Sequence, residues 1–322
     1  MRKLILLFFL PFVLFSCKKD PVPEGLDLRE EMRLFVQRIA ATARQTDPGF
    51  IVIPQNGADL VVSGMSASAP AAADYLSAID GIGQEDLLYG YNRDDQASPA
   101  SEVAGRRAFL DIAKANGVSI LVTDYCSTPS NMDNSYAQNA AAGYVSFAAD
   151  DRNLSRIPGY PSQINRPNAN DILSLDQVQN FLYLINDENF ASRQAFIDAV
   201  VATNYDLVIM DLFFKDGSTF TASDLNQLHL KANGRRRLVV SYMSIGEAED
   251  YRYYWQSQWK PGKPTWLDKE NKQWKGNYKV HYWDLNWQDY IYRGSGSYLS
   301  KILSAGFDGA YLDIIDGFEY YE

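Results

Sequence analysis

The sequence predicts a single large domain of the α/β class, in which parallel strands alternate with covering helices. The chain has 322 residues, a length that suits two modest domains or one large barrel. Its strand-like runs are nearly continuous in apolar residues, as parallel strands buried on both faces are, and amphipathic patterns separate many of them. Nine candidate strands for eight places indicate a (β/α)8 TIM barrel with one decoration. A doubly wound open sheet is the alternative, but no Gly-x-Gly-x-x-Gly follows a strand to support a dinucleotide cofactor.

The candidate elements are short apolar runs that end at polar residues. The strands are Phe50–Pro54, Ile79–Tyr89 in part, Val118–Tyr125, Tyr144–Ala148, Phe181–Ile185, Leu207–Leu212, Leu238–Met243, Val280–Trp283 and Gly309–Ile315. Helical patterns between them cover 103–116, 189–202, 222–232 and 295–305. A segment rich in Pro and Asn at 157–171 crosses between the two halves.

The clearest helix, Leu28–Gln45, has no strand before it. Asp27 is a good N-cap, and Glu30 follows three residues later, as in a capping box. The last candidate strand, Gly309–Ile315, has only a few residues after it. Since each barrel strand needs a helix outside it, we expect the first helix to cover the last strand. The two ends of the domain then lie side by side, as in a barrel cut open between a strand and its helix.

The N-terminal residues have the pattern of an export signal. Arg2 and Lys3 precede a 12-residue apolar run that is too short to span a bilayer. The run leads into Leu14-Phe15-Ser16-Cys17, which resembles a bacterial lipobox with lipid attached to Cys17. A plain signal peptide with a chance Cys is the alternative. We therefore expect a lipoprotein signal peptide at 1–16, a tether at 17–26 and the barrel domain at 27–322, anchored in the outer membrane on a side that the sequence does not indicate.

Composition narrows the chemistry. Lys and Arg number 30 and Asp and Glu 40, for a formal charge of −10 that becomes −12 once residues 1–16 are removed. Such an acidic chain does not suit nucleic acid. Loss of Cys17 to lipid leaves Cys126 as the only thiol, and His229 and His281 are too few for a His-built metal centre. We expect no metal and no cofactor.

Acidic residues stand at the ends of many candidate strands, where a barrel has its active site. They are Asp124, Asp211, Glu247, Glu249, Asp250, Asp284 and Asp313, with Glu85 near another such end. Glycoside hydrolysis needs two carboxyl groups, one proton donor and one nucleophile or base. Each acid taken alone could instead cap a helix or pair with an arginine such as Arg252. Convergence of several acids on one mouth favours the catalytic interpretation.

Several segments resemble the bacterial branch of glycoside hydrolase family 114, the endo-α-1,4-polygalactosaminidase-like barrels. They are Ser244–Arg252 (SIGEAEDYR), Trp266-Leu267, Asn277–Val280 leading to Trp283-Asp284, and Gly306–Asp316 (GFDGAYLDIID). The resemblance places Asp313 on the Asp that the family uses in catalysis. Pro54–Gly57 (PQNG) is similar to a segment that in the family follows the strand with that Asp, whereas here it comes early. The resemblance therefore implies a circular permutation.

The family's second catalytic carboxylate, a Glu, lies at the end of that next strand, where this chain has Gln55 and Asn56. Glu247, Glu249 or Asp124 would then supply the second group. As substrate-binding residues we expect Asp211, Tyr242, Asp250, Arg252, Trp283, Asp284, Gln55 and Asn56. All six tryptophans lie between Trp255 and Trp287, and we expect most to serve packing and two or three to line a sugar cleft.

These features indicate an exported, lipid-anchored glycoside hydrolase, endo-acting on an α-linked polysaccharide that contains galactosamine. A free amine makes galactosamine cationic, which fits the acidic chain. The alternative is a non-catalytic glycan-binding lipoprotein on the same barrel, with Asp313 orienting sugar.

Overall fold

The computed structural model describes residues 22–322, so the predicted signal peptide and Cys17 lie outside the described residues. Two parallel sheets form the centre of the fold. One has the strand order β1-β11-β7-β6-β5, and the other has the order β2-β3-β4. Their bounds are β1 Ile51–Pro54, β2 Gly81–Glu85, β3 Ser119–Tyr125, β4 Val145–Ala149, β5 Phe181–Tyr183, β6 Leu207–Asp211, β7 Leu238–Ser244 and β11 Gly309–Asp313.

The two sheets meet along two lines. Between β1 and β2, Gln55 and Gly83 form a parallel bridge, and the Asp80 amide donates to the Val52 carbonyl at 2.9 Å. Between β4 and β5 the contact is aromatic, with the Phe147 and Phe181 ring centroids 5.7 Å apart. Eight of the nine predicted strands are therefore parallel strands of these two sheets.

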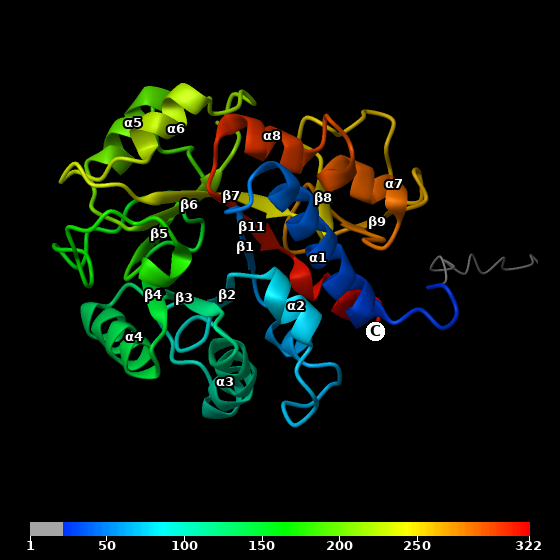
Figure 1. Ribbon diagram of the computed structural model, residues 1–322, viewed down its shortest axis with the longest axis horizontal. Helices are drawn as coiled ribbons and strands as arrows, with labels where there is room; N and C mark the ends of the chain where they lie inside the picture. The colour runs from blue at the N-terminus through cyan, green and yellow to red at the C-terminus, as the bar shows by residue number, and fades with distance from the viewer. Residues whose placement is uncertain (1–21) are drawn as a thin grey trace, which may run out of the picture.

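Helices lie around the outside of these strands (Figure 1). They are α1 Leu28–Thr46, α2 Ala73–Ala78, α3 Ala100–Ala115, α4 Pro129–Ala142, α5 Arg193–Val201, α6 Ala222–Leu228, α7 Leu285–Gln288 and α8 Tyr298–Ala305. Asp27 caps α1 by accepting from the Glu30 amide, as predicted, although the Glu30 carboxylate binds Arg33 at 2.7 Å. Short helical turns complete the chain: η1 Ala58–Val61, η2 Leu175–Gln177, η3 Asp289–Arg293 and η4 Ile315–Tyr320.

The prediction of Val280–Trp283 as a ninth parallel strand is wrong. The chain is extended over β10, Asn277–Val280, and turns before Trp283. β10 pairs antiparallel with β8 (Glu247–Glu249) and β9 (Leu267–Glu270) in a separate small sheet. The run Val280–Trp283 is apolar because Val280 and Tyr282 are buried beneath this decoration.

The first helix packs against η4 and the C-terminal residues that follow the last strand, whereas α8 is the helix that packs on β11 itself. Arg29 forms ion pairs with Asp59 and with Glu322, the latter at 2.8 Å, and its guanidinium lies 4.5 Å from the centre of the Phe318 ring. The Tyr282 hydroxyl donates to the Leu28 carbonyl at 2.7 Å. The expected neighbourhood of the two ends of the domain is therefore present, and in Figure 1 α1 runs beside the C-terminal segment.

Within residues 22–322, no helix has both the length and the apolar character that crossing a bilayer requires.

Candidate functional site

Inward-facing side chains at the carboxyl ends of the central strands form a polar layer. Side chains alternate along a strand, so Tyr311 and Asp313 of β11 share a face. Tyr311 packs against Gly83, where any added Cβ would collide with its hydroxyl, and its ring lies 5.1 Å from that of Tyr183. Hydrogen bonds link the members of the layer, which are Gln55, Glu85, Tyr125, Tyr183, Tyr242 and Asp313.

Asp313 lies in this layer, at the end of β11. The Tyr242 hydroxyl donates to its Oδ2 at 2.6 Å, and the Ile314 amide donates to its Oδ1 at 2.8 Å. Burial raises the pKa of Asp313 to about 8, with a further contribution from the negative charge of Glu85. Asp313 therefore holds a proton near neutral pH.

Glu85 is the carboxyl group that sequence reasoning underrated. The Gln55 amide donates to its Oε2 at 2.6 Å, and the Tyr125 hydroxyl donates to its Oε1. Burial also raises the pKa of Glu85. The residue ends β2, whose Gly-Ile-Gly-Gln-Glu sequence has too few β-branched residues to predict where the strand stops.

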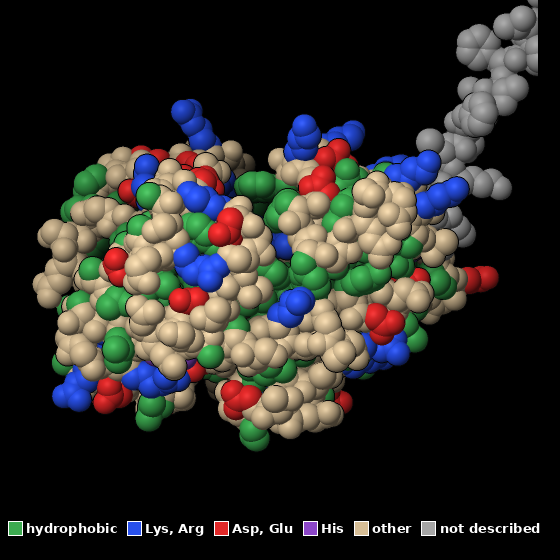
Figure 2. All heavy atoms as spheres, turned by 90° about the horizontal axis from the view of Figure 1, so that it is seen from above, with side chains coloured by type: hydrophobic (Ala, Val, Ile, Leu, Met, Phe, Trp, Pro, Cys, Tyr) green, Lys and Arg blue, Asp and Glu red, His purple; other side chains and the backbone are tan. Residues whose placement is uncertain are grey.

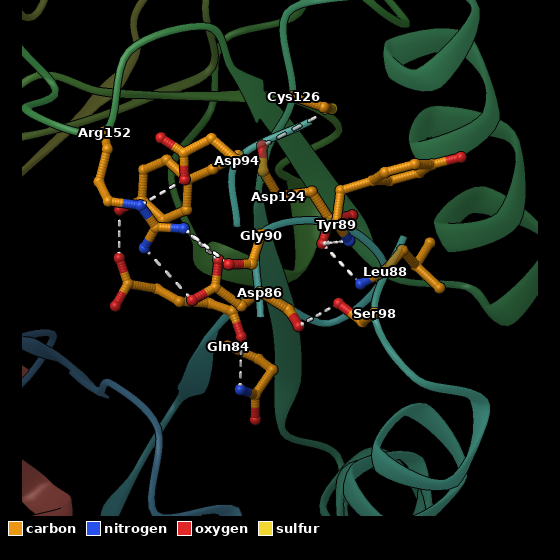
Figure 3. Close-up of polar contacts among 12 residues, drawn as sticks. Gln84, Asp86, Leu88, Tyr89, Gly90, Asp94, Ser98, Asp124, Cys126 and Arg152 are labelled. Atoms are coloured by element: carbon orange, nitrogen blue, oxygen red, sulfur yellow. Dashed lines mark hydrogen bonds and ion pairs between the residues drawn. The ribbon is translucent and has the colours of Figure 1, made fainter. Parts of the chain in front are cut away.

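Asp124 does not face Asp313, and that expectation is wrong. It alternates with Tyr125 along β3 and therefore points to the opposite side, toward α4. Its oxygens accept from the Leu88 and Tyr89 amides at 2.7 and 3.1 Å and from Ser135 at 2.6 Å, and the residue is fully buried. Figure 3 shows it directed at Leu88 and Tyr89. Asp124 fastens a loop and a helix to the strand.

Glu247 is fully buried between the small sheet and η4. Its carboxylate accepts from Asn271 at 2.8 Å, Tyr320 at 3.0 Å and Asn277 at 3.3 Å. Burial raises its pKa. These three neutral donors hold the small sheet against the C-terminal segment.

Glu249, Arg252 and Asp211 form a buried ion triad. Arg252 lies 2.6 Å from Glu249 and 2.7 Å from Asp211, and its side chain is only 6% exposed. The Tyr251 hydroxyl also donates to Glu249 at 2.6 Å. Each carboxylate is paired with the same guanidinium. Asp211 and Glu249 therefore show the arginine pairing that was the alternative to a catalytic role for these acids.

Some of the remaining predicted substrate-binding residues lie near Asp313 and others lie elsewhere. Tyr242 contacts Asp313 and belongs to the polar layer with Gln55. Asn56 instead accepts from the Glu85 backbone amide and from the Gln84 side chain, both at 3.1 Å. Asp284 caps α7, and Trp283 stacks on His281 with centroids 4.9 Å apart.

Asp250 is exposed on the small sheet, where its amide donates to the Gly276 carbonyl. The structure therefore does not bring Asp250, Trp283 and Asp284 into contact with Asp313.

Most of the tryptophans pack against one another, as expected. Trp266 and Trp287 are buried with ring centroids 5.1 Å apart, and Trp255 lies edge-on to Trp259 at 5.3 Å. Trp274 is the clear exception, with 53% of its surface exposed.

A polar cavity of about 490 Å³ lies beside the layer. It is lined by Asp86, Gly90, Tyr91, Asn92, Arg93, Asp94 and Arg152. Arg152 binds Asp86 at 2.8 Å and Asp94 at 2.6 Å (Figure 3), and its guanidinium lies 3.9 Å from the centre of the Tyr125 ring. Tyr125 in turn donates to Glu85, so Arg152 in the cavity wall contacts a residue that binds that carboxyl group. A larger cavity, about 970 Å³, lies at the opposite ends of β3 and β4 and is remote from these acids.

The described residues include no group of three His, Cys, Asp or Glu side chains placed to hold a metal ion. Parallel strands with a layer of carboxyl and phenol groups at their carboxyl ends define an α/β protein with a polar candidate site. Residues 176–321, which carry Asp313 and the ion triad, match the model of glycoside-hydrolase family GH114.

Three curated relatives are similar over part of the chain. The uncharacterized protein MJ1477 of Methanocaldococcus jannaschii is 37% identical over 163 residues, which cover 50% of this chain and 44% of that protein. An uncharacterized protein of Deinococcus radiodurans is 36% identical over 129 residues (40% and 39%), and one of Thermotoga maritima is 35% identical over 122 residues (38% and 36%). The chain thus spans less than half the length of these relatives.

Proposed function

We propose that this protein is an exported glycosidase that cleaves within a polysaccharide, with Asp313 as one of its two catalytic carboxyl groups. The observation that carries the proposal is the state of Asp313. It is a partly exposed carboxyl group at the end of a central strand, and its pKa is raised to about 8. A carboxyl group that keeps its proton at neutral pH is what protonation of a leaving sugar oxygen requires.

The proposed substrate is an α-linked polymer containing galactosamine. The resemblance to polygalactosaminidase-like proteins supports this substrate, as does the formal charge of −10, which attracts a cationic sugar. On the face shown in Figure 2, acidic and basic side chains are interspersed, so the attraction would come from the acids at the site rather than from that outer face.

We also propose that the eight parallel strands close into a (β/α)8 barrel that is permuted relative to its family. The Gln55–Gly83 bridge and the Phe147–Phe181 contact support closure. The ion pair between Arg29 and Glu322 supports a permutation, since it brings together the two ends that the cut would create.

The proposed anchor is a lipid on Cys17. Changing Cys17→Ala should abolish metabolic labelling with a fatty acid and release the protein from membranes. Unchanged membrane association in this variant would refute the lipobox interpretation.

The function is tested by measuring new reducing ends released from a panel of galactosamine-rich and galactosamine-free polysaccharides. We expect release from the first group, and loss of release with retained binding in Asp313→Asn, because the amide keeps the shape of the side chain and cannot ionise. Binding without release by the unchanged protein would favour the non-catalytic glycan-binding lipoprotein instead.

A further inference from the structure

We propose that Glu85 is the second catalytic carboxyl group, and that Gln55 and Tyr125 are the residues that position it. This inference rests on the proposed glycosidase function. It replaces Glu247, Glu249 and Asp124 in the role that the sequence suggested for them.

The strand order places Glu85 and Asp313 on the two strands that flank β1. β1 lies between β11 and β2, because the Gln55 amide donates to the Leu312 carbonyl at 2.8 Å and Gln55 bridges to Gly83. Adjacent strands are about 4.8 Å apart, so the two acids arise from backbones roughly 10 Å apart. Both side chains point to the inner face, with Gln55 between them, and a glycosidic bond can lie between the two carboxyl groups.

Access to the site separates Glu85 from the other candidates. Glu85 and Asp313 are both partly exposed. Glu247, Glu249 and Asp124 have at most 1% of their surface exposed. A carboxyl group that contacts a sugar must be reachable from solvent, and the exposed fraction of these three residues does not allow that.

Charge coupling links Glu85 to Asp313. The negative charge of Glu85 is the second largest influence on the pKa of Asp313 after burial, whereas that of Asp316 is the smallest of those recorded. Asp316 is the remaining rival, since burial and nearby acids raise its pKa to about 7. It lies in η4, the helical turn directly after β11, whereas Glu85 comes from a different strand, on the other side of β1.

The contacts of Gln55 explain why an amide suits this position. Its Oε1 accepts from the Tyr183 hydroxyl at 2.7 Å, which leaves Nε2 to donate to Glu85 at 2.6 Å. A Glu at position 55 would place two carboxyl groups at that distance, and their repulsion would prevent both from ionising. The amide at 55 and the carboxyl group at 85 therefore belong together as one arrangement.

The chemistry balances with these two groups and one water molecule. One carboxylic acid gives its proton to the glycosidic oxygen as the C1–O bond breaks. The other carboxylate either attacks C1 or takes a proton from the water that does. Water finally supplies the hydroxyl on C1 and returns one proton to the pair. Because Glu85 and Asp313 repel each other when both are ionised, each raises the pKa of the other, which favours a state with one protonated and one ionised group as this chemistry requires.

The test compares Glu85→Gln, Asp313→Asn and Asp316→Asn on the polysaccharide that the unchanged protein cleaves, with Glu102→Gln on the exposed side of α3 as control. We expect kcat to fall at least about 100-fold in Glu85→Gln and Asp313→Asn, with polysaccharide Kd changed less than about threefold. Glu85→Asp, which keeps the charge and withdraws it from Gln55 and Tyr125, should lose at least about tenfold in kcat. Circular dichroism and the melting temperature report whether each variant is folded.

Glu85→Gln with kcat within tenfold of the unchanged protein, alongside an inactive Asp313→Asn, would overturn the assignment of Glu85 and leave the glycosidase function standing. Loss of activity in Asp316→Asn but not in Glu85→Gln would transfer the role to Asp316. An unchanged protein that binds polysaccharides and cleaves none would instead remove the function on which the inference rests.

Discussion

The side-chain amide of Gln55 donates to Glu85 at 2.6 Å, and the carbonyl of the same amide accepts from Tyr183 at 2.7 Å. Three strands, β1, β2 and β5, thereby share one chain of hydrogen bonds at the carboxyl end of the central strands. Glu85 is held on its other oxygen by Tyr125.

Asp313→Asn should make the protein more stable at pH 8 and leave it unchanged at pH 4. The folded pKa of Asp313 is raised to about 8, so the aspartate contributes stability that is present below its unfolded pKa of about 3.9 and lost as the pH rises toward 8. The amide avoids that loss, and we expect a gain of at least about 1 kcal/mol at pH 8 from urea denaturation. Equal stability of the two proteins at pH 8 would contradict a raised pKa of Asp313 in the folded protein.

Tyr125→Phe should shift the acid limb of the pH profile of kcat/KM to higher pH. The Tyr125 hydroxyl stabilises the ionised form of Glu85 and lowers its pKa, so removing the hydroxyl lets Glu85 keep its proton to higher pH. Tyr89→Phe is the matched control, because that hydroxyl binds Asn134 at 3.0 Å and not Glu85. If both variants give the profile of the unchanged protein, Tyr125 does not tune the acid.

Arg252→Met should destabilise the protein by about 3–5 kcal/mol, because it leaves Asp211 and Glu249 buried without their shared cation. The stability of Arg252→Lys should lie between those of the unchanged protein and Arg252→Met, since a single ammonium group cannot reproduce the planar fork that contacts both carboxylates. The midpoint of urea denaturation measures both variants. A small effect of Arg252→Met, below about 1 kcal/mol, would mean that solvent reaches the triad.

Gly83→Ala should cost about 1–3 kcal/mol in the free energy of unfolding, because the added Cβ meets the Tyr311 ring inside the central strands. The matched control is Gly105→Ala in α3, where nothing lies within 4 Å of the new Cβ. Alanine favours a helix, so this variant should gain about 0.5–1 kcal/mol. Changes of the same sign in the two variants would show that Tyr311 does not fill the space above Gly83.

Sequence periodicity was sufficient to predict the parallel strands and the first helix, which has no strand before it. Burial on both faces requires continuous apolar runs such as Leu207–Leu212, and the stripe on α1 predicted a helix that needs a strand to cover. The prediction of a central strand at Val280–Trp283 was wrong, because apolar residues buried beneath the small antiparallel sheet have the same sequence pattern as those of a central strand. Asp124 misled for a related reason, since a shift of one residue along a strand reverses the face to which a side chain points.

The sequence by itself determined the class of fold and directed attention to Asp313, because these depend on local periodicity and on motifs within one segment. Only the tertiary structure pointed to Glu85 as the acid that we propose accompanies Asp313. Glu85 is 228 residues away along the chain, and it reaches the site through the order of β2, β1 and β11 in space. A carboxyl group's accessibility, its donors and its pKa depend on neighbours brought from other strands, and these are set by packing rather than by the residues on either side.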